Sequence, residues 1–425
     1  MATQAQDKSA RTVLLAAARN TPVASRMAMR FAGMGCRVAA VYPSKAHLLA
    51  STKAVSSHFH YGSIDPVGTL LNAMSESGAE VVAPCDGITV RHLHALYGNL
   101  PSTPEGGAFA QVIQRSLGDP TAYLVVDSRH EIQMSARNEE LNAAESFAIG
   151  KATDPEKTAL ALPFPWMLKT DYSWGPRGQR MVRTLGEARR FIRKANNSPS
   201  LAMVARQMLV NDDRAALEEW LHAKRPGLSA QRPIAGLGAN AVAACWKGTV
   251  LASISVEGLP GASGSWPQAI VRMVENPEMD RSVRRMSDRL GLTGFHSFDF
   301  VLEAGTGKAW LTEFNSHCTQ ASHLNAGAGH DLVAAFCERW LGTTAGESAA
   351  APGLAQAVPV HPGKVLAYFP QALAANPSDP ILDTGAFDIP SEDPEFVRRA
   401  KELAARDERY EKFKSRVSSL FSSKR

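Results

Sequence analysis

The chain is 425 residues long, which allows two or three domains with substantial cores. Hydrophobic residues make up 44% of it and charged residues 20%, proportions that are typical of a soluble globular protein. The net charge of +5, from 46 basic and 41 acidic residues, is too small an excess to indicate a nucleic-acid partner.

The cysteine and hydropathy patterns both favour a cytoplasmic protein. The five cysteines are widely spaced and include no CxxC pair, which fits a reducing compartment better than a disulfide framework. The first residues, MATQAQDKSAR, are polar, and no apolar run is long enough to cross a membrane. We therefore expect neither a signal peptide nor a membrane partner.

Residues 11–120 are expected to form an open parallel sheet, as in a Rossmann-like domain, because strand and helix patterns alternate along them. The predicted elements are strands at 12–17, 37–43 and 79–86 and helices at 22–33 and 66–78. The first turn, AARNTPVAS, contains no GxGxxG, so the backbone cannot closely approach a pyrophosphate there.

A second domain is expected to follow. YLVVDS (123–128) predicts a strand, and NEELNAAESFAIG (138–150) predicts a helix that ends at its last glycine. An apolar strand at 201–210 and two strands within 240–258 are also predicted, and 279–291 has the apolar spacing of an amphipathic helix.

A glycine-containing loop lies between two predicted strands in FPWMLKTDYSWGPRGQRMVRT (164–184). The first strand carries Lys169, and the loop contains Gly175 and Gly178. Glycines let a loop lie close to phosphates, which backbone N–H groups and a lysine at a strand end can then bind. A plain surface hairpin is the alternative interpretation.

A β-hairpin with a five-residue loop, AGTGK, is predicted from two apolar segments. The segments are Phe295–Glu303 and Ala309–Asn315. A hairpin centred on Thr306 places Leu302 opposite Trp310, and Asp299 opposite Glu313.

Three oxygen-bearing side chains are expected to share one face of this hairpin. Side chains alternate along a strand, so Glu313 and Asn315 point the same way, and the pairing adds Asp299 to that face. Two carboxylates about 5 Å apart repel each other unless a proton or a cation lies between them. Together with the amide they form a ligand set that suits Mg²⁺. The solvent-exposed face of an ordinary hairpin is the alternative.

The Asp in an apolar strand, the short turn and the Glu-x-Asn of the next strand resemble the metal-binding hairpin of ATP-grasp enzymes. That family includes the D-alanine–D-alanine ligases and amino-acid ligases. The resemblance implies an α/β ATP-grasp fold with an N-terminal open parallel-sheet domain and a small C-terminal module. The implied parts are a pre-ATP-grasp domain at 11–120, a small lobe at 121–208, a large lobe at 209–341, and a linker with a C-terminal module at 342–425.

The resemblance also implies a nucleotide site. Asp299, Glu313 and Asn315 would hold two Mg²⁺ ions, with Mn²⁺ as an alternative, on the phosphates of ATP. The residues that would contact ATP are Lys169, Gly175 and Gly178 at the phosphates, Gln207, Met208 and Leu209 at the adenine edge, and either Arg137 or Arg129 at the α-phosphate. The strand ends of the first domain would line the substrate pocket, with Asn20 and Asp86 as candidates unless each caps a helix.

The chain departs from the family after Glu-x-Asn, where Ser316, His317 and Cys318 replace a small residue or Pro and then Arg, and at Ser297, where many members have Arg. If catalysis is retained, another cation must stabilise the transferring phosphoryl group. Arg272, in a predicted strand, is the first candidate and His317 the second.

The activity that the resemblance implies is that of an ATP-dependent ligase, which activates a carboxylate as an acyl phosphate and joins it to an amine. The alternatives are a kinase-like phosphoryl transferase and an ATP-binding regulatory protein without catalysis. The expected partners are small-molecule carboxylates and amines, and a homodimer is left open. The chain has no GxxxxGK[ST], HExxH or GxSxG motif that would favour another enzyme class.

Overall fold

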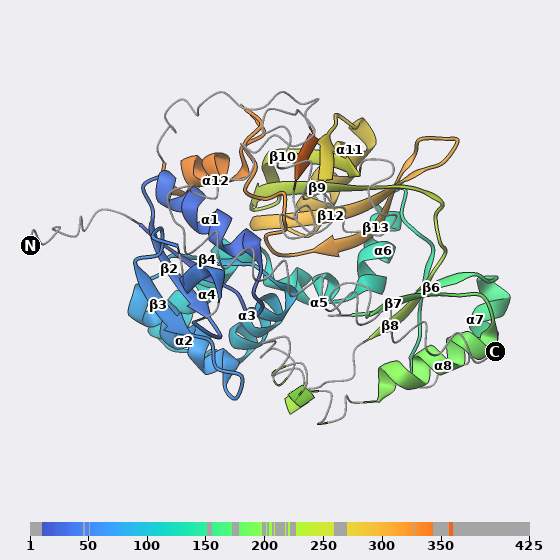
Figure 1. Ribbon diagram of the computed structural model, residues 1–425, viewed down its shortest axis with the longest axis horizontal. Helices are drawn as coiled ribbons and strands as arrows, with labels where there is room; N and C mark the ends of the chain where they lie inside the picture. Colours follow the sequence, from blue (N-terminus) through green and yellow to red (C-terminus); the bar gives the residue numbers. More distant parts are fainter. Residues whose placement is uncertain are drawn as a thin grey trace, which may run out of the picture.

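Figure 1 shows the computed structural model of the protein. It describes residues 11–342 and 357–359, apart from 46, 51, 151–154, 172–177, 198–200, 202–203, 206–207, 209–216, 218–219, 222–226, 259–269 and 328. The predicted C-terminal module therefore lies outside the described residues. Within them, no helix is both long and apolar enough to cross a membrane.

The N-terminal part is a parallel sheet with the strand order β3-β2-β1-β4, which confirms the predicted open sheet. Its strands are β1 (Thr12–Ala16), β2 (Arg37–Tyr42), β3 (Ser57–His60) and β4 (Val81–Pro84). Its helices are α1 (Pro22–Gly33), α2 (Pro66–Ser77), α3 (Gly87–Asn99) and α4 (Pro104–Leu117). Both faces are covered, so β1 and β4 are fully buried and consist almost entirely of apolar residues.

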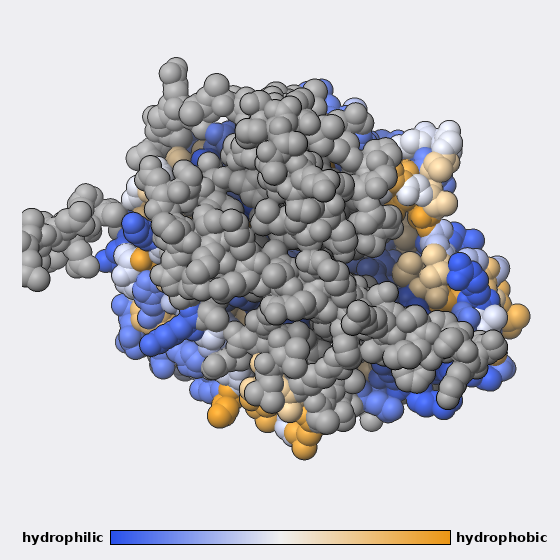
Figure 2. Space-filling view, in the orientation of Figure 1, coloured by the Kyte–Doolittle hydropathy of each residue, from blue (hydrophilic) through white to orange (hydrophobic). Residues whose placement is uncertain are grey.

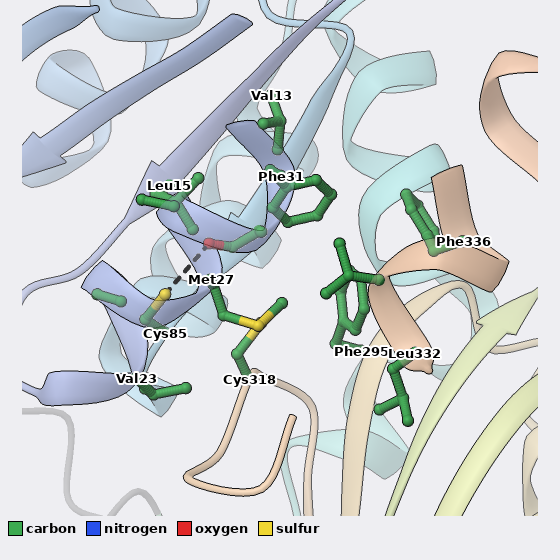
Figure 3. Packing of buried hydrophobic residues seen from close by; sticks show 14 of the residues in the cluster. Val13, Leu15, Val23, Met27, Phe31, Cys85, Phe295, Cys318, Leu332 and Phe336 are labelled. Carbon is green, nitrogen blue, oxygen red and sulfur yellow. Dashed lines mark hydrogen bonds between the residues drawn. The ribbon is translucent and has the colours of Figure 1, made fainter. Parts of the chain in front are cut away.

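The two faces of this sheet belong to different cores. Leu14 and Ala16 pack with α2, α3 and α4, whereas Val13 and Leu15 on the opposite face pack with α1. The core on the α1 side of the sheet extends beyond the N-terminal part, because Phe31 of α1 meets Phe295 with 5.8 Å between ring centroids (Figure 3). The N-terminal sheet therefore shares one continuous core with the part of the chain around Phe295 and Phe336.

A small antiparallel sheet has the order β5-β8-β6-β7. Its strands are β5 (Ser146–Ala148), β6 (Trp166–Thr170), β7 (Gln179–Val182) and β8 (Leu228–Gln231). Trp166 and Leu168 pack in one core with apolar residues of α7 (Pro155–Ala161) and α8 (Leu185–Asn196). The visible surface over α2 and α8 is mostly hydrophilic (Figure 2).

Three predicted elements between the sheets are wrong. Residues 123–126 form helix α5 (Tyr123–Val126), because Asp119 and Pro120 begin a 3-10 turn that runs directly into it. The segment 138–150 holds strand β5, whereas the helix α6 (Arg129–Asn138) lies before it and is capped by Ser128. Within 201–210, the described residues Leu201, Val204, Ala205 and Met208 are helical, not extended.

The largest sheet is antiparallel, with the order β13-β12-β9-β10-β11-β14. Its strands are β9 (Gly236–Trp246), β10 (Thr249–Gly258), β11 (Ile270–Met273), β12 (Gly294–Glu303), β13 (Ala309–Asn315) and β14 (Ala357–Pro359). Helix α11 (Pro277–Arg289) packs on one face with α6, and α12 (Leu332–Leu341) packs on the other. The two strands predicted within 240–258 and the helix predicted at 279–291 are confirmed.

Candidate nucleotide and metal site

The predicted hairpin is β12 and β13, joined by residues 304–308. Asp299 lies opposite Glu313, as expected, but Trp310 pairs with Val301 and not with Leu302. The register shifts by one residue beside Asp299, and Thr312 is the extra residue of the resulting β-bulge. A bulge leaves one residue out of the ladder, so the carbonyl of Thr312 can accept a bond from outside the sheet.

Asp299 is held from both neighbouring strands. Asn240 of β9 lies opposite it and donates from Nδ2 to Asp299 Oδ1 at 2.5 Å. From β13, Asn315 Nδ2 donates to Asp299 Oδ2 at 3.3 Å. Burial, and then repulsion from Glu313, raise the pKa of Asp299 to about 7. Asn240, Asp299 and Glu313 thus form a polar row across three apolar strands.

Two cations, the half-buried Arg129 and the buried Lys169, face Glu313 from other elements. Arg129 is at the start of α6, and its Nη1 lies 2.6 Å from Glu313 Oε2. Lys169 of β6 places Nζ 4.0 Å from the same oxygen and donates to the Thr312 carbonyl at 2.8 Å. Burial alone would raise the pKa of Glu313, but these cations outweigh it and hold that pKa below its usual value.

The environment of Lys169 is unusual for a lysine, because only 5% of the residue is exposed. Burial lowers the pKa of Lys169 to about 8, although Glu313 opposes that shift. Asp171, which directly follows β6, accepts a bond from the backbone N–H of Arg129 at 2.9 Å. The strand β6 and the helix α6 are thereby fixed to each other at the site.

The other predicted ATP contacts are placed differently. Arg137 is exposed on the last turn of α6, at the opposite end of the helix from Arg129. Gly178 precedes β7, and its carbonyl accepts a bond from the Thr170 N–H at 2.8 Å. Met208 is helical and half-buried, while Gly175, Gln207 and Leu209 lie outside the described residues.

The two candidates for the catalytic cation also lie apart from each other. Arg272 is in β11, opposite Glu257, with β10 and β9 between it and the hairpin; its side chain lies outside the described part of the chain. His317 follows β13 and lies near Gly87 at the start of α3. Burial lowers its pKa, so its ring is neutral near pH 7, and Nδ1 donates to the Cys318 carbonyl at 3.0 Å.

The hairpin fits a magnesium site through the chemistry of its donors. Among the described residues, no group of three or more His, Cys, Asp or Glu is arranged to hold a metal ion. The hairpin offers two carboxylates and the Asn315 amide, and Mg²⁺ commonly takes few protein ligands and completes its shell with phosphate and water. Burial, and then the charge of Glu313, raise the pKa of Asp299, and a divalent cation bound beside the two carboxylates would favour their charged forms.

Asp86, which the sequence offered as a pocket candidate, accepts bonds from the Ala18 and Arg19 N–H groups and caps α3, which agrees with its alternative interpretation as a helix cap. Two other residues at the site were not singled out by the sequence patterns. Asn240 and Asp171 were missed. The signal for Asn240 was one polar residue near the start of the apolar strand NAVAAC, which becomes informative only once it is paired with Asp299.

Solved structures share this architecture. No protein-family model matches the chain, and no curated protein matches it in sequence. N5-carboxyaminoimidazole synthase from Aspergillus clavatus, in complex with ADP and 5-aminoimidazole ribonucleotide, is 15% identical at a TM-score of 0.55, over 82% of this chain and 81% of its own.

Two further structures are similar to the same extent. An ADP complex of N5-carboxyaminoimidazole ribonucleotide synthetase is 12% identical at a TM-score of 0.54, over 82% of this chain and 80% of its own. The biotin carboxylase domain of 2-oxoglutarate carboxylase from Hydrogenobacter thermophilus, with MgADP, ADP and bicarbonate, is 15% identical at a TM-score of 0.53, over 79% and 70%. The chain therefore has the ATP-grasp fold.

Proposed function

We propose that the protein is an ATP-dependent ligase, which activates a carboxylate as an acyl phosphate, joins it to an amine or a related nucleophile, and releases ADP. The observation that carries this proposal is the convergence of Asp299, Glu313 and Asn315 with Arg129 and Lys169, from four elements, in a protein with the ATP-grasp fold. Two carboxylates beside two largely buried cations form a site that can bind both a metal ion and phosphates.

The roles of the individual side chains follow from their charges. Asp299, Glu313 and Asn315 would hold Mg²⁺, as two ions, with Mn²⁺ as an alternative. The metal would supply neutralisation of the phosphate oxygens. Lys169 and Arg129 would bind the phosphates directly, and Arg129 is preferred to Arg137 because it lies at Glu313. Gly175 and Gly178 would close over the phosphates, and Gln207, Met208 and Leu209 would contact the adenine edge.

The substrates would approach from the side of the N-terminal part. His317, which follows the hairpin, lies near Gly87 of α3, and Gln320 Nε2 donates to Thr21 Oγ1 at the start of α1 at 3.1 Å. A small carboxylate and an amine are the expected substrates, in a cytoplasmic protein without a nucleic-acid partner, and a homodimer is compatible with this assignment. Arg272 remains the first candidate for the cation at the transferring phosphoryl group, and His317 the second.

The test is ADP release from Mg²⁺ and ATP across a matrix of carboxylates and amines. A ligase releases ADP only when both substrates are present, a kinase-like transferase releases it with a single hydroxyl substrate, and a regulatory protein binds ATP without turnover. Arg272→Ala and His317→Ala are then compared in the same assay. Loss of less than about tenfold in turnover for Arg272→Ala would remove it from the mechanism.

A further inference from the structure

The metal-ligand carboxylate Glu313 already has two partners in the free protein. Its Oε2 is shared by Arg129 Nη1 at 2.6 Å and Lys169 Nζ at 4.0 Å. Only 16% of the Arg129 side chain and 19% of the Glu313 side chain are exposed, so the pair is largely shielded from solvent. The neighbouring Asp171 holds the backbone of Arg129, and the bulge carbonyl of Thr312 holds Lys169.

We infer that Glu313 is the counter-ion of Arg129 and Lys169 in the free protein, and that binding of Mg²⁺ and ATP exchanges these partners. Mg²⁺ would then bind Glu313, and Arg129 and Lys169, once released from Glu313, would bind the phosphates. This inference rests on the proposed function. It adds that, without ligands, the metal-binding carboxylate and the phosphate-binding cations are bound to each other. Metal and nucleotide therefore each improve the binding of the other.

The two arrangements exclude each other for electrostatic reasons. Mg²⁺ on Glu313 Oε2 would lie about 2.0–2.1 Å from that oxygen, so a guanidinium 2.6 Å from the same oxygen would lie only a few ångströms from a divalent cation. The inferred exchange therefore has Arg129 leave Glu313 Oε2 when the metal binds there. A buried cation that loses its partner is costly unless another anion replaces it, and the triphosphate supplies that anion.

The exchange predicts a counter-intuitive effect of Glu313→Gln. This substitution keeps the shape of the side chain, removes a metal ligand, and removes the carboxylate that holds Arg129 and Lys169 away from the phosphates. In EDTA, the variant should therefore bind ATP at least fivefold more tightly than the parent protein. The parent protein should bind ATP more tightly with Mg²⁺ than in EDTA, and this gain in ATP affinity should be largely absent from the variant.

The experiment is calorimetric titration of ATP into each protein, in EDTA and in excess Mg²⁺, with circular dichroism to verify the fold. Glu303→Gln is the matched control, because Glu303 lies on the same hairpin but is exposed at its turn, bonded to Thr306. This control should match the parent under both conditions. Adding Arg129→Gln to Glu313→Gln should cancel the gain in EDTA, since Arg129 is the side chain released.

If Glu313→Gln does not fold, Glu313→Asp takes its place, because the shorter carboxylate retreats from Arg129 and should also tighten ATP binding in EDTA. Unchanged or weaker metal-free binding in the folded variant, while the parent binds ATP with Mg²⁺, would overturn the counter-ion exchange and leave the proposed function standing. A parent protein that binds no ATP under either condition would overturn both.

Discussion

At the scale of single residues, the position of Asp299 depends on a neighbour that is not itself charged. Asn240 Nδ2 lies within hydrogen-bonding distance of Ser297 Oγ at 2.7 Å, the Phe298 carbonyl at 3.3 Å and Asp299 Oδ1 at 2.5 Å. The amide is buried, so its orientation is set by these acceptors. Asn240 is thus a positioning residue for the carboxylate that we assign to the metal.

Asn240→Ala should remove this support and leave Asp299 free to turn away from Glu313. Loss of an outer partner of a metal ligand typically weakens metal affinity about tenfold or more. We expect the Mg²⁺ concentration for half-maximal ATP binding to rise by that factor, while the metal-free ATP affinity changes little. A titration of Mg²⁺ at fixed ATP measures this, and an unchanged Mg²⁺ requirement would show that Asp299 needs no support from β9.

His296 makes the stability of the protein depend on pH. Its Nε2–H donates to the Thr293 carbonyl at 2.9 Å, and burial lowers its pKa from 6.5 to about 4. Between these two values the unfolded chain binds a proton that the folded chain does not, so the free energy of unfolding falls as the pH falls from 6.5 toward 4. The full loss from this residue is about 3 kcal/mol.

His296→Gln should abolish this contribution. We expect the difference in unfolding free energy between parent and variant to shrink as the pH is lowered from 7 to 5, as measured by urea denaturation. Comparison of the two proteins cancels the titration of the carboxylates, which both share. A difference that stays constant over this range would mean that His296 has the same pKa in the folded and the unfolded protein.

At the scale of the elements, two glycines let the end of α4 and the start of β12 meet backbone to backbone. Gly118, at the end of α4, pairs with Leu292, and a Cβ placed on it would lie 2.3 Å from the Gly291 carbonyl oxygen. Gly294, at the start of β12, has φ +96°, and its Cβ would lie 2.1 Å from the Ser116 carbonyl oxygen. No residue with a side chain fits either position.

Gly294→Ala should therefore lower the free energy of unfolding by about 2 kcal/mol or more, from the left-handed backbone and the steric clash together. Gly305→Ala, in the hairpin loop, is the matched control, because its φ is +88° but no atom lies within 4 Å of the added Cβ. Thermal unfolding of both variants separates the two causes. Equal losses would show that the contact with Ser116 can relax.

The same scale shows which elements a sequence can predict. The hairpin was predictable because alternation, loop glycines and turn length all indicate it, and Asp299 and Glu313 were therefore paired correctly. The bulge was not predictable, since the carbonyl it releases is bonded to Lys169, 143 residues away. Likewise, Ser146–Ala148 has local helical composition but pairs with β8, so a distant strand overrides its propensity.

The same division holds for the proposed nucleotide site. Lys169 and the hairpin residues stood out as charges within apolar strands, but the choice between Arg129 and Arg137 required the helix boundary. The helix begins at Arg129, not after Arg137, because the side chain of Ser128 caps it and accepts a bond from the Glu131 N–H. The polar row with Asn240 depends on the order of strands in the sheet, which no local pattern records.

At the scale of the whole molecule, the N-terminal sheet and the six-stranded sheet with α12 should unfold together. Their shared core runs from Val13 and Phe31 through Phe295 to Phe336 (Figure 3). Trp340 belongs to the same core and lies beside Phe336. Separating the two parts would expose these rings to water, at roughly 25 cal/mol for each Å² of apolar surface. We expect one cooperative transition for both parts in differential scanning calorimetry, and two resolved transitions assigned to them would contradict this.

This shared core also limits how such proteins can be recombined. A chimaera that takes its N-terminal sheet from another protein with this fold would bring a foreign α1 against Phe295 and α12, and the facing side chains would not interlock. An exchange of substrate preference by domain grafting would therefore have to transplant α12 and the segment after β13 along with the sheet. In this chain, the residues that must be exchanged together are those that face each other across the shared core, and they do not form one continuous segment of sequence.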